Sequence, residues 1–167
     1  AVIRQLEVED NAASIDDSVM GWGIVLEAAL DLTDRVTVRG SFIHGDAIGG
    51  YLNENPQSDK GTAPASAFVD AGGNLKAIES TGGTVGVSIK AGPGTINAVA
   101  FQTTTDLDEN YFAGNQIEKF QSVWLNYIWS PVQNVSYGVE IGQHSAKQLD
   151  GNDEDAVRLQ GMLKYSF

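Results

Sequence analysis

Basic side chains recur inside segments that are otherwise rich in apolar residues, whereas the acidic residues gather in loop-like stretches. Arg35 and Arg39 stand an even number of positions apart, as do Arg158 and Lys164, so each pair would share one face of an extended strand. Rings of Arg and Lys around a water-filled opening attract anions electrostatically. We therefore interpret five residues as lining an aqueous lumen and selecting anions: Arg35, Arg39, Lys90, Arg158 and Lys164.

No set of residues predicts catalysis, a cofactor or a metal site. His44 and His144 lie far apart in sequence, and Ser145 would point away from His144 on a strand. The acidic run at 150–155 lacks the spacing of a calcium loop. Without cysteine, the chain has no disulfide framework and no thiol nucleophile. We expect no enzyme activity, no cofactor and no bound metal.

The end of the chain has the pattern of a strand with one apolar face. The apolar positions alternate with more polar ones and are Val157, Leu159, Gly161, Leu163, Tyr165 and Phe167. Ending on an aromatic residue is typical of the last strand of outer-membrane barrels in Gram-negative bacteria. We therefore predict that Tyr165 and Phe167 form a signal for the barrel assembly machinery. The alternative is a buried edge strand of a soluble β-sandwich.

Alternation and turn residues predict an all-β chain with eight strands. The expected strands cover about 1–9, 20–31, 35–44, 81–91, 95–106, 119–130, 134–145 and 154–167. These lengths suit tilted strands that cross a bilayer, which need about 9–11 residues. No apolar run approaches the ~18–20 residues of a membrane helix. The prediction is an antiparallel transmembrane β-barrel forming one domain over 1–167.

The predicted connections alternate between short turns and long polar loops. The short ones are 32–34, 92–94 and 131–133, and the long ones are 11–19, 45–80, 107–118 and 146–153. Transmembrane barrels keep short turns in the periplasm and long loops outside, which places the Phe167 end at the periplasmic side of the bacterial outer membrane. The 45–80 loop is the candidate to fold inward and narrow a channel. A plain surface loop is the alternative.

Several predicted strands have one apolar face, which we assign to lipid. Its members are Trp22, Ile24, Leu26, Ala28, Leu30, Val36, Val38, Gly40, Phe42, Val85, Val87, Ile89, Val123, Leu125, Tyr127, Trp129, Val135, Tyr137, Val139 and Ile141. Charged side chains in mid-strand must face water, because each would cost ~2–4 kcal/mol in mid-bilayer. Trp124 falls on the lumen face in this register, and a register error is the alternative. The strands at 1–9 and 95–106 show no decisive face.

The amino-acid composition limits the kinds of partner that the protein can bind. The net charge of −12 argues against nucleic-acid binding, which needs clustered Lys and Arg. The chain starts at Ala1 without a signal peptide, so we expect a mature or truncated form. The partners expected from the barrel prediction are outer-membrane lipids, lipopolysaccharide, the assembly machinery and small anionic solutes.

Several motifs together resemble the DcaP-type porins. They are VIRQL at 2–6, GWG at 21–23, GDAIGGYL at 45–52, NYIWSPVQNV at 126–135, YGVEIG at 137–142 and VRLQGMLKYSF at 157–167. The resemblance spans nearly the whole chain and places it on the C-terminal half of such a porin. It implies a homotrimer of roughly sixteen-stranded barrels that passes small anions such as dicarboxylates.

The chain departs from that family by showing eight strands and no coiled coil. It is then either a fragment or a half-sized barrel, and charged inner faces favour the fragment, because an eight-stranded barrel fills its interior with side chains. The rival hypothesis is a small closed barrel that serves as an anchor or adhesion surface. Pairing of Glu27 with Arg39, or of Glu140 with Arg158, would favour this rival. A soluble β-sandwich binding module is the third hypothesis.

Overall fold

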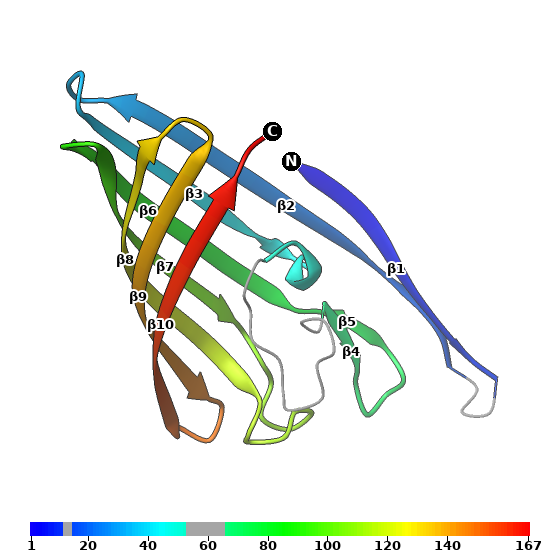
Figure 1. Ribbon diagram of the computed structural model, residues 1–167. Coiled ribbons are helices and arrows are strands. Elements are labelled where there is room, and N and C mark those ends of the chain that lie inside the picture. The colour runs from blue at the N-terminus through cyan, green and yellow to red at the C-terminus, as the bar shows by residue number, and fades with distance from the viewer. Residues whose placement is uncertain (12–14, 53–65) are drawn as a thin grey trace.

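The computed structural model describes residues 1–11, 15–52 and 66–167. Eight strands form one antiparallel sheet in the order β1-β2-β3-β6-β7-β8-β9-β10. Their bounds are β1 Val2–Asp10, β2 Ile15–Asp31, β3 Val36–Asp46, β6 Glu79–Ala91, β7 Gly94–Thr105, β8 Ile117–Val132, β9 Val135–Gln148 and β10 Asp153–Tyr165. The sheet is strongly curved (Figure 1) and open, since β1 and β10 are not paired with each other within the described residues. No helix in the described residues is long and apolar enough to cross a membrane.

The eight predicted strands are therefore confirmed, with shifts at their ends. β2 begins at Ile15 rather than near residue 20, because its first half pairs with β1. The predicted 45–80 loop contains a 3-10 turn, η1 (Gly49–Tyr51), and a short hairpin of β4 (Ala67–Val69) and β5 (Leu75–Ala77). Alternation over three residues is too short to predict such strands from sequence.

The connections at the two ends of the sheet differ in length for most strand pairs. The β2–β3, β6–β7 and β8–β9 turns lie at one end, the short-turn end, together with both termini, and the β3–β6, β7–β8 and β9–β10 connections lie toward the other, the long-loop end (Figure 1). The β3–β6 and β7–β8 connections are long, whereas the β9–β10 connection covers only 149–152, as many residues as the β2–β3 turn at 32–35. Gly92 supplies the positive φ of 56° that the tight β6–β7 turn requires, and Asn134 has a φ of 67° in the β8–β9 turn. The predicted alternation of connectors thus holds for 45–80 and 107–118, but it is wrong for 11–19 and 146–153, because β2 and β9 extend into those segments and pair with their neighbours.

Strand pairing decides which residues share a face, because residues directly opposite each other point the same way. In this register every residue assigned to lipid from the sequence lies on one face, which we call the outer face. The opposite side is the inner face. The two undecided strands are also placed: Ile3 of β1 and Ala98 of β7 face outward, whereas Arg4 and Asn97 face inward. Trp124 faces inward as predicted.

From the middle of the sheet toward the short turns the outer face is apolar and uncovered, whereas at the long-loop end Glu7, Glu9 and Asp16 lie on it. Leu159 is 81% exposed, Leu26 63%, Val123 58% and Val139 51%. The buried apolar side chains in the described residues are few: Ala47, Ile48, Leu52, Ile78 and Ala146. A water-soluble monomer rarely exposes so continuous an apolar surface. This face is therefore suited to contact lipid rather than water.

Aromatic residues cluster near both ends of the outer face. At the short-turn end, Trp129 stacks on Tyr127 and Tyr137 with ring centroids 5.3 and 5.7 Å apart, and Tyr165 stacks on Phe167 at 6.5 Å. At the long-loop end, the Trp22 indole N–H donates to Asp46 Oδ2 at 2.8 Å. Rings that combine an apolar body with a polar edge suit the two interfaces of a bilayer.

Candidate functional site

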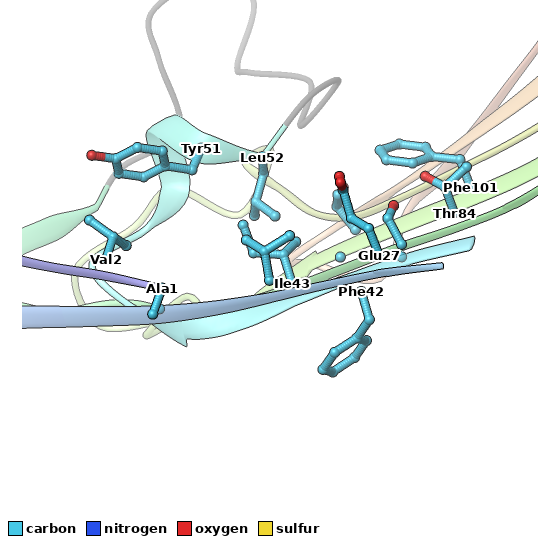
Figure 2. Close-up of a pocket in the computed structure, with 15 residues that line it drawn as sticks. Ala1, Val2, Glu27, Phe42, Ile43, Tyr51, Leu52, Thr84 and Phe101 are labelled. Atoms are coloured by element: carbon cyan, nitrogen blue, oxygen red, sulfur yellow. The ribbon is translucent and has the colours of Figure 1, made fainter. Parts of the chain in front are cut away.

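The start of the long β3–β6 connection folds onto the inner face. Ala47, Ile48 and Leu52 are buried there, against glycines of β2 and β6. A Cβ added to Gly23 would lie 2.8 Å from Ile48 Cγ2, and one added to Gly82 would lie 2.9 Å from Leu52 Cδ2. Only a strand surface without side chains lets the segment approach this closely. Figure 2 shows Leu52 above the sheet together with Ile43 and Glu27, and Phe42 projecting from the opposite face.

The predicted inward fold of the 45–80 loop thus holds for residues 47–52, and residues 53–65 lie outside the described chain. Further contacts fix this region at the long-loop end. The Arg4 guanidinium lies 5.7 Å from the Tyr51 ring centroid, a cation–π contact. The backbone N–H of Leu75 donates to Asp17 Oδ2 at 2.7 Å and ties the β4–β5 hairpin to β2. In that hairpin the Asn74 backbone N–H donates to Asp70, which lowers the pKa of the Asp70 carboxyl.

The inner face carries rows of residues that run across the strands. One, the arginine row, joins Arg39, Gly86, Val99, Trp124, Gly142 and Arg158. The next row toward the short turns, the amide row, joins Thr37, Ser88, Asn97, Asn126, Glu140 and Gln160. Arg39 and Arg158, far apart in sequence, therefore lie at the same level of the sheet.

The other three predicted basic residues lie toward the short turns. Lys90 is opposite Thr95, and its Nζ donates to the Asp34 carbonyl at 3.0 Å. Lys164 is opposite Ser136, on the inner face. Arg35 stands in the β2–β3 turn, one residue before β3 begins at Val36, and not within a strand as its segment was predicted. The structure thus separates two arginines in mid-sheet from three basic residues at one rim.

The amide row forms a chain of side-chain hydrogen bonds. Ser88 Oγ donates to Asn97 Oδ1 at 2.7 Å, Asn97 Nδ2 to Asn126 Oδ1 at 2.7 Å, and Asn126 Nδ2 to Glu140 Oε2 at 3.0 Å. These partly buried polar groups span four strands, β6 to β9. Their remaining donors and acceptors face the inner side, so the row can bind water or polar solutes.

An aromatic cluster lies next to the arginine row, and sequence reasoning missed it as a group. His144 stacks on Phe120 at 6.0 Å and meets the Trp124 edge at 5.4 Å, and its Nδ1 is 2.8 Å from Ser122 Oγ. Phe101 lies 6.4 Å from Trp124. The indole lies across Gly142, where an added Cβ would be 2.5 Å from Trp124 Cδ1. The shared parity of Phe120 and Trp124 on β8 is the one signal that could have indicated the cluster.

The mid-sheet charges on the inner face are not paired with one another. In the described residues ion pairs join Lys76 with Asp70 at 3.6 Å and Lys147 with Glu118 at 3.0 Å, both at the long-loop end. Among the residues that the structure describes, Glu27 forms no ion pair with Arg39, and Glu140 forms none with Arg158. Unpaired charges of this kind need water, which disfavours a sealed interior.

Two cavities open along these rows. One, of about 670 Å³, is lined by Glu27, Arg39, Ser88, Asn97 and Asn126. The other, of about 480 Å³, lies over β7 to β10 and contains Trp124, Glu140 and Arg158. A third, of about 370 Å³, lies between the inner face and the η1 segment (Figure 2). All are within the size range of small-solute sites.

No family model matches the chain, and no curated protein matches it. Among solved structures, the outer membrane channel DcaP of Acinetobacter baumannii is similar, with a TM-score of 0.77 and 22% sequence identity. The alignment covers 99% of this chain and 46% of that channel, so the chain spans just under half of the channel's length. The chain therefore has a DcaP-like porin fold, an antiparallel sheet of the kind that forms a transmembrane β-barrel wall.

Proposed function

We propose that this chain forms part of the wall of an outer-membrane diffusion channel for small hydrophilic solutes. The observation that carries the proposal is the inverted distribution of polarity: the outer face is apolar and exposed, while the inner face carries unpaired charges and an amide row. A water-filled barrel in lipid requires this arrangement. The likeness to an outer membrane channel supports it through the fold.

We propose that further strands complete the barrel. The open sheet, whose edge strands β1 and β10 are not paired with each other among the described residues, and the 46% coverage of the DcaP channel support this proposal. The rival closed eight-stranded anchor would pair these two strands and fill its interior. Insertion by the barrel assembly machinery, a homotrimeric state and a periplasmic position of the Phe167 end remain part of the same proposal.

Solute preference in the proposed channel is for anions, dicarboxylates included, and is modest. Arg39 and Arg158 stand in the arginine row, with Arg35, Lys90 and Lys164 toward the short-turn rim. Carboxylates share the inner face with them: Glu27, Asp31 and Glu140 from the middle of the sheet toward the short turns, and Asp10, Asp17 and Glu154 toward the long-loop end. Opposite charges on one face reduce the net field, and salt screens the remainder over a Debye length of ~10 Å at 0.1 M.

Replacing Arg35, Arg39 and Arg158 together by Gln is expected to shift the reversal potential in a salt gradient toward cations. The reason is that the carboxylates of the inner face remain while three cations are lost. The measurement is planar-bilayer electrophysiology of the native protein and the variant at low salt. Uptake of a dianion should fall more than uptake of a neutral sugar of similar size.

The control is Lys147→Gln, which removes a cation from the long-loop end where Lys147 already pairs with Glu118. It should leave the reversal potential near that of the parent. An unchanged reversal potential in the triple variant would refute the assignment of anion preference to these residues.

A further inference from the structure

We propose that the cavity over β7 to β10 is a binding subsite for zwitterionic solutes with an apolar side chain, such as a hydrophobic amino acid. The inference rests on the proposed function, because the lumen gives such a solute its access. It goes beyond that function by naming a solute class that anion preference does not explain. The cavity of about 480 Å³ combines one carboxylate, one guanidinium and an aromatic wall.

The two charged residues of the subsite, Glu140 and Arg158, are neighbours on the inner face but do not contact each other. Glu140 lies opposite Gln160, and Arg158 opposite Gly142, so the two charged residues are diagonal neighbours on the inner face. Diagonal neighbours have Cα atoms roughly 7–8 Å apart. In the described residues they form no ion pair with each other or with any other side chain. Each charge is thus left without an opposite charge, in a cavity that both of them line.

The carboxylate is oriented by the amide row. Asn126 Nδ2 donates to Glu140 Oε2 at 3.0 Å, whereas Oε1 accepts no hydrogen bond from the described residues. An ammonium group could therefore bind at Oε1 without breaking the row. Arg158 is exposed on β10 and makes no hydrogen bond within the described chain, so its guanidinium can bind a carboxylate with two parallel N–H donors.

The wall between the two charges is apolar and aromatic. The Trp124 indole lies across Gly142, the residue opposite Arg158, and Phe120 and His144 stack beside it. Each ring is partly exposed and so presents surface to the cavity. A simple anion would satisfy Arg158 but meet the Glu140 carboxylate, and a cation would meet Arg158. A zwitterion satisfies both charges, and an apolar side chain then covers the indole.

Binding of L-phenylalanine to the native protein in detergent tests this inference. Ligand-observed saturation-transfer NMR should show saturable binding in the millimolar range, as expected for a solute that must also leave the channel. Three competitors separate the contributions: 3-phenylpropionate lacks the ammonium, phenethylamine lacks the carboxylate, and glycine lacks the apolar side chain. Each should compete at least about tenfold more weakly. For the first two, a hydrogen bond to a charged group is worth about one such factor, and for glycine the burial of an apolar side chain, about 1.5–3 kcal/mol, is lost.

Glu140→Gln and Arg158→Gln should each weaken phenylalanine binding about tenfold, and the exchange Glu140→Arg with Arg158→Glu should restore it, because the zwitterion can turn around. The control Glu154→Gln removes a carboxylate from the same face of β10 outside the cavity and should keep the parent's affinity. Heat-modifiable migration shows that each variant is folded.

Four outcomes would each overturn the inference. They are binding of 3-phenylpropionate equal to that of phenylalanine, equal competition by glycine, unchanged affinity of the Glu140→Gln variant, and no binding of phenylalanine. Because binding is measured without a membrane, these outcomes are independent of conductance. A folded protein that binds phenylalanine but conducts no ions would instead refute the proposed channel.

Discussion

Leu159→Arg is expected to abolish most of the folded barrel in the membrane, whereas Gln160→Arg, one residue further along β10, leaves it intact. Leu159 stands at the middle of the strand, on the outer face and 81% exposed. An arginine on the lipid face of a barrel costs ~2–4 kcal/mol at mid-depth. That range corresponds to roughly a thirtyfold to several-hundredfold loss in the ratio of folded to unfolded protein.

Gln160 is the matched control because its side chain points to the inner face, directly opposite Glu140. A new arginine there meets water and a carboxylate rather than lipid. Folded yield in lipid vesicles, measured by heat-modifiable migration and by urea titration, compares the two variants. Equal stability of the two variants would mean that β10 does not divide lipid from water.

Deleting Phe167 is expected to reduce outer-membrane insertion severalfold and to leave aggregates in the periplasm. Phe167 follows the end of β10, is fully exposed, and stacks on Tyr165 at 6.5 Å, while the Ser166 N–H donates to the Asn134 carbonyl at 2.9 Å. The last residue is thus held in line with the strand and presents its ring outward, where an assembly factor can bind it. The readout is the amount of folded protein in isolated outer membranes.

Phe42→Ala is the control for this deletion, since it removes another ring from the outer face away from the end of the chain. Its expected effect on insertion is small. Normal insertion after deletion of Phe167 would refute the assembly role, and equal losses in both variants would assign the effect to lipid contact alone.

The two faces of the sheet could be predicted from sequence because the alternation of apolar and polar residues within one strand distinguishes them. Alternation within a strand such as Met20–Asp31 reports which side chains avoid water, and no information from other strands is needed. Connector length is less local, because strand pairing extends β2 and β9 into segments that the sequence predicts as loops, 11–19 and 146–153. The strands at 1–9 and 95–106 instead mix polar and apolar residues on the same face. Strand pairing places Arg4 inward together with Val2 and Leu6, and Asn97 inward together with Val99.

The rows across the inner face could not be predicted, because they depend on register between strands. That Arg39 and Arg158 share a level, or that Trp124 lies over Gly142, follows from turn geometry and from the bulge in β8 between Trp129 and Val132. The packing of the η1 segment on the inner face depends on two glycines, Gly23 and Gly82, that lie on strands distant in sequence. The parity of Arg35 with Arg39 predicts a strand position for it, whereas the backbone at Arg35 still belongs to the β2–β3 turn.

The central claim is that the sheet separates water from lipid, and single-cysteine labelling along β7 tests it most directly. The chain contains no cysteine, so each introduced thiol is unique. Positions 97 and 99 face inward, and positions 98 and 100 face outward. With each single-cysteine variant folded in lipid vesicles, a water-soluble maleimide should label cysteines at 97 and 99 rapidly. Those at 98 and 100 should react at least about tenfold more slowly, because the thiolate that reacts is disfavoured in lipid.

All four thiols should react equally after unfolding in detergent, which is the control for intrinsic reactivity. Equal labelling of all four positions in vesicles would indicate a soluble sheet, and protection of all four would indicate a sealed barrel. Either result would contradict the account, whereas alternation between neighbouring residues is what a water-filled channel wall predicts.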